Sequence, residues 1–171
     1  AGVAPELGRN ALMELSHQLL QTDGLSDPSL GIKFNWTIAR AGTTRNVIPD
    51  EASAAADVRV QRVADYDAIE KRFRERLNTQ RVPDTKLEPG FERRRPPLEV
   101  SEASRGVARK AVAIYGELGR TLVWDESGRG GGTDAAFAAY SGKPAVVESF
   151  GLAGFGYHSS EEEYVELASV E

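Results

Sequence analysis

The stretch from residue 32 to residue 38 reads Ile32-Lys33-Phe34-Asn35-Trp36-Thr37-Ile38. Apolar side chains alternate with polar ones, and this period of two is typical of a β-strand that buries one face. The segment 52–60 repeats the pattern with small side chains, and its apolar face would comprise Ala52, Ala54, Ala56, Val58 and Val60. With residues 42–49 as their connection, the two segments predict an antiparallel sheet that has one buried face.

Two amphipathic helices are predicted, one before and one after this pair of strands in the sequence. Asn10 is placed to cap the first helix and Gly24 to end it, and its apolar stripe would comprise Leu12, Leu15 and Leu19. His17 falls off this stripe, so we expect it to be solvated. Asp65 is placed to cap the second helix, whose stripe would comprise Ile69, Phe73 and Leu77.

A further strand is predicted over residues 86–95, interrupted by Pro89-Gly90. The resulting order, helix-strand-strand-helix-strand, predicts an α+β domain with both helices on one face of an antiparallel sheet. Pro96-Pro97 is typical of a seam between domains. We therefore expect one domain over residues 1–97 and a second over residues 98–171.

The second domain is predicted to alternate helices with short strands. Ser101 is placed to cap a helix that ends at Gly119, and its buried stripe would comprise Val107, Ala111, Ile114 and Leu118. Short strands are expected at 121–124 and 144–147, on either side of a helix over 133–140. Alternation of this kind favours a parallel sheet covered by helices.

Charge and composition exclude several classes of function. The 171 residues include 21 basic and 26 acidic side chains, and the net charge of −5 lacks the electropositive character that nucleic acid requires. No apolar run is long enough to span a bilayer, so we expect no membrane insertion. The absence of cysteine excludes disulfides and thiol catalysis but leaves a cytoplasmic or a periplasmic location open.

The glycine run Gly130-Gly131-Gly132-Thr133-Asp134 is the strongest candidate for a site. Glycines that lead into a helix can turn free backbone N–H groups towards an anion or a carbonyl oxygen. A tight turn with an ordinary helix cap explains the run equally well. A nucleotide site is not expected, because neither G-x-G-x-x-G nor a Gly-Lys-Ser/Thr ending is present.

His158 lies in a second glycine-rich stretch, Gly154-Phe155-Gly156-Tyr157-His158, and could supply a nitrogen ligand to a metal. A lone histidine is more often an ordinary surface or core residue. No second histidine or carboxylate follows at the spacing of a metal-binding motif. If His158 binds a metal, the other ligands therefore come from elsewhere.

Arginines provide two further candidates. Arg59 shares a strand face with Asp57, and this arrangement fits a charge pair on a solvated face or a guanidinium that binds a substrate carboxylate. The run Arg93-Arg94-Arg95 similarly fits a solvated cluster or an anion contact.

Five motifs of this chain occur in the same order in a known family. They are Ala1-Gly2-Val3-Ala4-Pro5-Glu6-Leu7-Gly8-Arg9-Asn10-Ala11-Leu12, Arg45-Asn46-Val47-Ile48-Pro49, Ala56-Asp57-Val58-Arg59, Gly130 to Asp134 and Gly154 to His158. Together they closely resemble the di-zinc metallopeptidases of the aminoacylase and acetylornithine deacetylase type, most of all the bacterial glutamate carboxypeptidases. The resemblance covers nearly the whole chain.

This resemblance implies an α+β lid and dimerisation domain followed by the C-terminal part of an α/β zinc-peptidase catalytic domain. It implies that Asn46 and Arg59 reach the substrate's terminal carboxylate and that Gly131 belongs to a substrate-contacting loop. Arg95 is similar to a further substrate-binding arginine, with its two neighbours as alternatives. His158 is similar to the family's last zinc ligand.

The chain also departs from the family's pattern. It begins at the alanine of the family's His-Ala-Gly motif, so the histidine of that motif, the other zinc ligands, the bridging aspartate and the general-base glutamate are not in it. The first strand of the lid, which in a split β-α-β fold lies inside the sheet, is also missing. We expect no catalytic residue in this chain and no activity from it alone.

The expected parent is thus a homodimeric hydrolase that uses two zinc ions to cleave a small peptide or an acyl-amino acid beside a C-terminal glutamate or similar residue. The alternative from another class is a non-enzymatic dimerisation or substrate-lid module. An RNA-binding α+β domain is disfavoured, because the exposed strand face offers Asp57 and Arg59 in place of basic and aromatic residues.

Overall fold

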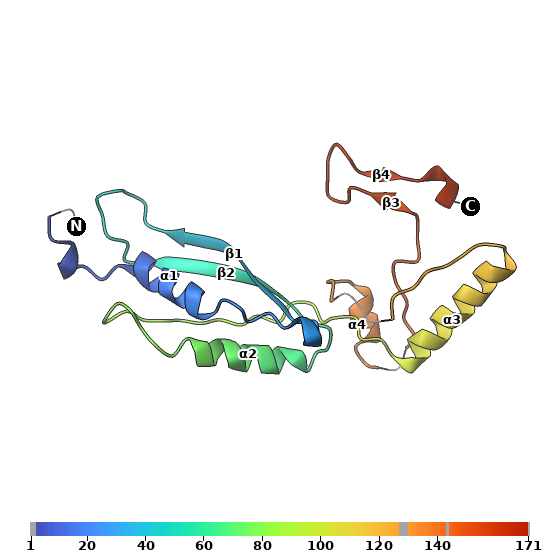
Figure 1. Ribbon diagram of the computed structural model, residues 1–171, viewed down its shortest axis with the longest axis horizontal. Helices are drawn as coiled ribbons and strands as arrows, with labels where there is room; N and C mark the ends of the chain where they lie inside the picture. Colours follow the sequence, from blue (N-terminus) through green and yellow to red (C-terminus); the bar gives the residue numbers. More distant parts are fainter. Residues whose placement is uncertain (1–2, 127–129, 143, 171) are drawn as a thin grey trace. The chain divides into compact units, whose positions relative to one another are not determined.

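The computed structural model describes residues 3–126, 130–142 and 144–170 (Figure 1). The chain divides into two compact units, the first formed by Ala1–Val100 with Asp125–Lys143 and the second by Ser101–Trp124 with Pro144–Glu171. The first unit thus takes in the glycine run from the later part of the sequence. The division into residues 1–97 and 98–171 stays a prediction.

The two predicted strands are present in the first unit. β1 (Lys33–Ala41) pairs antiparallel with β2 (Ala52–Arg59), in a register that runs from Lys33 opposite Arg59 to Ala41 opposite Ala52. The register shifts between Trp36 and Ile38, and the hydroxyl of Thr37 donates to the carbonyl oxygen of Ala55. An extra residue in one strand reverses the faces beyond it. The predicted strict alternation is therefore wrong at Ile38, which is half exposed.

Both predicted helices are present, one before and one after the two strands in the sequence. α1 (Ala11–Gln21) begins after Asn10, whose side-chain oxygen accepts from the backbone N–H of Leu12 and Met13, so this cap is confirmed. α2 (Asp65–Arg76) has Ala64 at its N-cap, so the predicted capping role of Asp65 is wrong. Asp65 instead lies in the first turn, where its carboxylate accepts two hydrogen bonds from Arg62.

The core lies between the sheet and the helices, and Figure 1 shows α2 beneath the β1–β2 hairpin and α1 overlapping β2. Its buried members are Leu25, Ile32, Val60, Tyr66, Ile69 and Phe73, and Phe34, Trp36, Val58, Leu77 and Phe91 pack against them. The Phe34 and Phe73 rings lie 5.9 Å apart between centroids, and the indole N–H of Trp36 donates to Thr22 Oγ1. One sheet face therefore contacts both α2 and the end of α1.

The stripe predicted for α1 is only partly buried. Leu12 is exposed, while Glu14 and Gln18 are the buried residues of this helix. Polar side chains can be buried there because each has hydrogen-bond partners. His17 is half-buried, and its ring Nε2 lies 3.5 Å from the hydroxyl of Thr79 in an exposed contact.

The strand predicted over residues 86–95 is wrong, because the described segment forms no strand. Its side chains nevertheless alternate in burial from Thr85 to Phe91, as they would in a strand. A strand is defined by its hydrogen-bonded neighbour as well as by its side-chain pattern. The segment has the pattern without such a neighbour.

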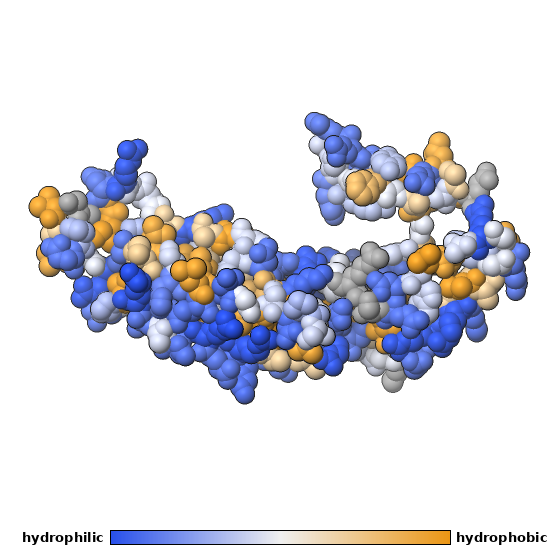
Figure 2. Space-filling model, in the orientation of Figure 1, coloured by the Kyte–Doolittle hydropathy of each residue, from blue (hydrophilic) through white to orange (hydrophobic). Residues whose placement is uncertain are grey.

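The second unit contains α3 (Glu102–Glu117), which Ser101 caps by accepting from the N–H of Ser104, as predicted. The predicted buried stripe is wrong, because Val107, Ile114 and Leu118 are exposed. Figure 2 shows apolar residues at the surface in the region of α3. No parallel sheet is found among the described residues of this unit to cover the stripe.

The predicted parallel sheet is also wrong. Neither 121–124 nor 144–147 forms a strand, and the sheet of the second unit is the antiparallel pair β3 (Gly154–Phe155) and β4 (Tyr164–Val165). The short helix α4 (Ala135–Ala139) follows the glycine run in the first unit. The remaining elements in the described part of the chain are three single-turn 3₁₀ helices, Pro5–Leu7, Pro28–Leu30 and Leu167–Ser169.

The core predicts the effect of a truncation in α2. Ile69 is fully buried, so Ile69→Ala should lower the free energy of unfolding by about 2–5 kcal/mol through lost apolar contact and a residual cavity. Leu20→Ala, at a residue that is 76% exposed, should change it by less than about 0.5 kcal/mol. Urea unfolding measures both variants, and equal losses would contradict the assignment of the core.

Candidate functional site

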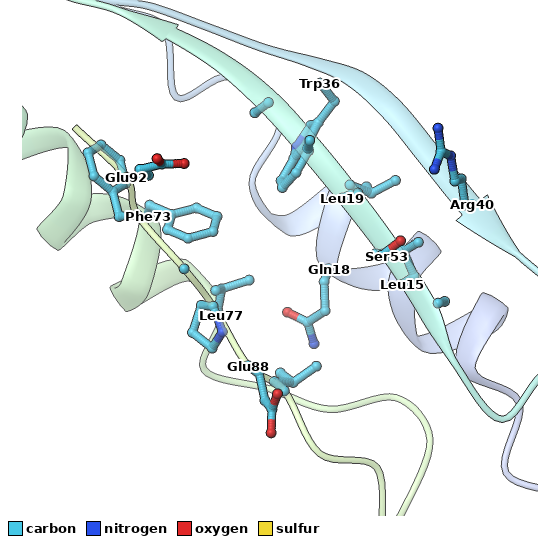
Figure 3. Close-up of a pocket in the computed structure, with 18 of the residues that line it drawn as sticks. Leu15, Gln18, Leu19, Trp36, Arg40, Ser53, Phe73, Leu77, Glu88 and Glu92 are labelled. Atoms are coloured by element: carbon cyan, nitrogen blue, oxygen red, sulfur yellow. The ribbon is translucent and has the colours of Figure 1, made fainter. Parts of the chain in front are cut away.

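The first unit contains a groove of about 1710 Å³. β2 forms one wall, and the extended segment from Asp84 to Glu92 forms the other. α1 and α2 contribute the floor. In Figure 3, Leu15 and Leu19 lie near the strands, Phe73 and Leu77 lie near the extended segment, and the amide of Gln18 projects between them.

Glu14 attaches the beginning of the extended wall to α1. One oxygen of its carboxylate accepts from the backbone N–H groups of Arg81 and Val82, at 2.9 and 2.7 Å. The other accepts from the side-chain amide of Gln18, which also donates to the carbonyl oxygen of Thr79. Burial raises the pKa of Glu14, but these hydrogen bonds outweigh burial and hold the pKa below its ordinary value.

α2 holds the far end of the same wall. Arg93 donates to Asp67 and Glu70 and lies over the ring of Tyr66, and Arg74 donates to the carbonyl oxygen of Pro89. The pKa of Arg93 is raised because both carboxylates accept its hydrogen bonds. The wall is thus attached to both helices at its two ends.

Three of the predicted substrate-binding residues lie at the end of the groove where β2 ends. Arg59 is the last residue of β2, and the next residue, Val60, has its carbonyl oxygen 3.0 Å from the position that a Cβ on Gly130 would occupy. Gly132 approaches the side chain of Arg95 and forms an isolated bridge with Pro97. Gly131 lies between these two contacts. The structure therefore brings Arg59, Gly131 and Arg95 to one region.

The close approach explains why glycine is needed in the run. Gly130 has a φ of +64°, and a Cβ at this position would crowd the backbone of Val60. The helix that follows has five residues and begins after Asp134, which does not cap it through its side chain. Thr133 accepts from the N–H of Ala135. The run is therefore a tight turn that packs against β2.

The side chains of Arg59 and Arg95 are about half exposed. Arg59 donates to Asp57 of the same strand at 2.7 Å, so the charge pair runs along the strand. Arg95 lies 3.5 Å from Asp134, while its backbone carbonyl accepts from the hydroxyl of Tyr66. Burial raises the pKa of Tyr66, which keeps the hydroxyl protonated as a donor. Exposed pairs of this kind contribute little stability, so both guanidinium groups can exchange partners.

Asn46 lies apart from this region. It is an exposed residue of the loop before β2, whereas Arg59 ends that strand. Eight residues of extended strand span about 26 Å. One protomer therefore does not place Asn46 and Arg59 beside the same small ligand.

His158 belongs to the second unit. It is exposed, lies in the turn between β3 and β4, and has a φ of 72°. Within the described residues, no group of three or more histidine, cysteine, aspartate or glutamate side chains could hold a metal ion. The ligand role of His158 stays a prediction.

None of the described helices is long and apolar enough to cross a bilayer.

Sequence reasoning missed the polar contacts that build the groove. Glu14 and Gln18 are four residues apart on α1, but nothing in their spacing indicates that their partners are backbone groups of residues 79–82. The signal available was the presence of two polar residues beside the apolar stripe of a helix.

Comparison with known proteins assigns the first unit's fold. Residues 1–85 match the peptidase dimerisation domain of the M20 family. It is 47% identical over 170 residues to carboxypeptidase G2 from Pseudomonas sp. (strain RS-16), an alignment that covers 99% of this chain. The family resemblance noted in the sequence is thereby confirmed.

A second relative matches a shorter stretch. This is a homologue of a p-aminobenzoyl-glutamate hydrolase component from Haemophilus influenzae, 42% identical over 60 residues, which are 34% of this chain and 14% of that protein. The chain spans 40% of the length of carboxypeptidase G2. It thus corresponds to part of that relative and includes the dimerisation domain.

The geometry predicts that Glu14 stabilises the groove in a pH-dependent way. Glu14→Gln keeps the shape but removes the charge that accepts two backbone N–H groups, and should lower the free energy of unfolding by about 1–3 kcal/mol near neutral pH. Because the folded-state pKa is lowered, the stabilisation is present above the unfolded-state pKa and is lost as the pH falls through the folded-state pKa. The wild-type protein and the variant should therefore converge in acid.

Urea unfolding at a series of pH values checks this prediction. Glu6→Gln, at an exposed glutamate outside the groove, is the matched control and should leave the pH profile of stability unchanged. A constant difference between Glu14→Gln and the wild-type protein at every pH would show that the charge of Glu14 is not the cause.

Proposed function

We propose that the chain is part of a zinc-dependent carboxypeptidase or deacylase that hydrolyses an amide bond next to a C-terminal glutamate or a similar acyl-amino acid. The observation that carries this proposal is the 47% identity to carboxypeptidase G2 along 99% of the chain. The name of the second relative, a homologue of a p-aminobenzoyl-glutamate hydrolase component, supports a glutamyl substrate.

In this proposal the first unit binds the substrate's terminal carboxylate. Arg59 and Arg95 end in guanidinium groups that are accessible and lie at the same end of the groove. A guanidinium binds a carboxylate through two parallel hydrogen bonds, which orients the substrate as well as attracting it. Gly131 adds backbone groups beside them. Among the three adjacent arginines, Arg93 is held by α2 and Arg95 adjoins the glycine run, which favours Arg95.

The parent enzyme would hold two zinc ions, with His158 as one ligand. An exposed imidazole in a glycine-rich turn fits this role, and a catalytic zinc requires about three protein ligands, so the others must lie outside the described residues. When bound, the metal pair polarises the amide carbonyl and lowers the pKa of a water molecule. In this proposal the residues of this chain bind the substrate and supply one zinc ligand. The chain by itself would have no activity.

The distance between Asn46 and Arg59 supports a homodimer. Since the length of β2, about 26 Å, lies between the loop that carries Asn46 and the strand end that carries Arg59, we infer that the two contact one substrate only if Asn46 comes from the other protomer. The dimerisation domain of the first unit provides a route to that arrangement. Each substrate site would then be completed by the lid domain of the second protomer.

A second candidate is a non-enzymatic dimerisation or substrate-lid module. It is favoured by the match of residues 1–85 to a dimerisation domain and by the lack of a metal-binding cluster among the described residues. The two functions differ in what a longer, zinc-loaded parent protein should do. Hydrolysis of glutamyl substrates supports the enzyme, and inactivity across acyl-amino acids supports the module.

Substitution of Arg95 in the parent protein tests the role of the groove end. Arg95→Ala should lower kcat/KM for a glutamyl substrate by about 10–100-fold, mainly through KM, because a charged hydrogen-bond partner of the carboxylate is removed. Arg94→Ala is the matched control, since the side chain of Arg94 is 80% exposed and pairs with Glu92. Equal effects of the two variants would contradict the assignment.

Zinc-dependent hydrolysis by the 171-residue chain alone would refute the proposed division of roles between this chain and the rest of the parent protein.

The oligomeric state provides an independent prediction. Light scattering after size-exclusion chromatography should give twice the mass of the 18.5 kDa chain. In the parent, mixing an inactive Asn46→Ala variant with an inactive Arg59→Ala variant should restore part of the activity, because each mixed dimer contains one site with both native residues and one site with neither. A strict monomer, or no restoration on mixing, would contradict the shared site.

A further inference from the structure

Tyr66 connects the two segments that carry the candidate arginines. It lies in the first turn of α2, is 9% exposed and lines the groove. Its ring belongs to the same buried core as Val60, the residue that follows Arg59 at the end of β2. Its hydroxyl donates to the backbone carbonyl oxygen of Arg95 at 3.1 Å. One side chain therefore joins the end of β2 to the segment that carries Arg95.

The surroundings of the Tyr66 ring hold the hydroxyl in place. The guanidinium carbon of Arg93 lies 5.8 Å from the ring centroid, and the ring of Phe91 packs edge-on with its centroid 6.4 Å away. Arg93 is itself held by Asp67 and Glu70 of α2. A side chain whose rotamer is fixed by packing on several sides keeps its polar end in a defined position. The hydroxyl of Tyr66 is therefore a fixed point from which the carbonyl can be held.

The acceptor is a backbone group that determines where the Arg95 side chain begins. The carbonyl of Arg95 belongs to the peptide bond before Pro96, and a residue that precedes proline is restricted to extended conformations. A hydrogen bond to this carbonyl restricts the ψ angle of Arg95 further, and so restricts the direction of its Cα–Cβ bond. The guanidinium group stays about half exposed. Tyr66 can thus aim Arg95 without touching a ligand.

The hydroxyl of Tyr66 remains a donor in this environment. Burial raises the pKa of Tyr66, Arg59 and Arg93 lower it, Asp57 raises it, and the net shift is upward. The hydroxyl is therefore protonated at neutral pH and can donate to the carbonyl. The influence of Arg59 and Asp57 also places it within electrostatic reach of the charge pair on β2.

We propose that Tyr66 is a positioning residue for the substrate carboxylate. Its hydroxyl holds the backbone of Arg95 against the end of β2, so that the guanidinium groups of Arg95 and Arg59 keep the relative positions that one carboxylate requires. Tyr66 itself does not contact the substrate. A supporting side chain of this kind keeps a binding group within the narrow range of geometry that tight recognition needs. This inference rests on the proposed function, because it requires both arginines to bind the carboxylate.

Tyr66→Phe in the zinc-loaded parent protein tests the inference. The variant keeps the buried ring and removes the hydrogen bond to Arg95. We expect KM for a glutamyl substrate to rise about 3–10-fold with kcat nearly unchanged, because one neutral hydrogen bond is lost and the zinc ligands are not altered. Tyr140→Phe, at a 66% exposed tyrosine outside the groove, is the matched control and should leave KM unchanged. Urea unfolding establishes that both variants fold.

A double-variant cycle separates positioning from a general contribution to packing. If Tyr66 acts through Arg95, Tyr66→Phe should have little further effect on KM in a protein that already carries Arg95→Ala. A merely structural contribution would add to the loss caused by Arg95→Ala. Additive losses, an unchanged KM in Tyr66→Phe, or a fall in kcat without a rise in KM would each overturn the inference.

A fluorinated tyrosine at residue 66 provides a second measurement if Tyr66→Phe does not fold. Fluorine makes the hydroxyl more acidic, so the hydroxyl stops donating to Arg95 at a lower pH than in the wild-type protein. KM should therefore begin to rise at a lower pH, and identical pH profiles of KM would overturn the inference.

The activity of the wild-type parent distinguishes the two levels of the argument. A zinc-loaded wild-type parent that hydrolyses no glutamyl substrate would overturn the proposed function and the role of Tyr66 together. An active parent whose KM does not respond to Tyr66→Phe would overturn the positioning role alone.

Discussion

The packing of the inner face of β1 against α2 is the contact on which the first unit depends. Phe34 and Trp36 lie against Phe73, and the indole N–H of Trp36 also reaches Thr22 at the end of α1. A two-stranded sheet is at best marginally stable alone, so it must bury one face against helices. Because both helices lie on this face, they also form a floor that extends beyond the edge of β2.

The groove follows from this arrangement. The floor is wider than the two strands that cover it, and residues 84–92 form a second wall instead of continuing the sheet. Glu14 and Arg93 attach this wall to α1 and α2 at its two ends. The wall is therefore fixed by side-chain contacts with the helices, and not by backbone pairing with β2.

Local patterns predicted the elements that depend on local contacts. The alternation at Ile32 to Ile38 indicated the first strand, and the capping residues Asn10 and Ser101 marked the starts of two helices. The predictions that failed required a partner elsewhere. Residues 86–95 and 121–124 have strand-like sequences but no hydrogen-bonded neighbour, and the stripe of α3 has no element to cover it among the described residues.

In the groove, the family resemblance indicated Arg59, Gly131 and Arg95, whereas the contacts of Glu14 could not be predicted because they join segments far apart in sequence.

The two faces of β2 differ in chemistry. Ala54 and Ala56 point to the floor, whereas Asp57 and Arg59 point to the exposed face. The alanine face packs on the helices, while the charged face stays in solvent, where the guanidinium of Arg59 can exchange its partner Asp57 for a ligand. Core packing and the proposed binding of a carboxylate therefore use opposite faces of the same strand.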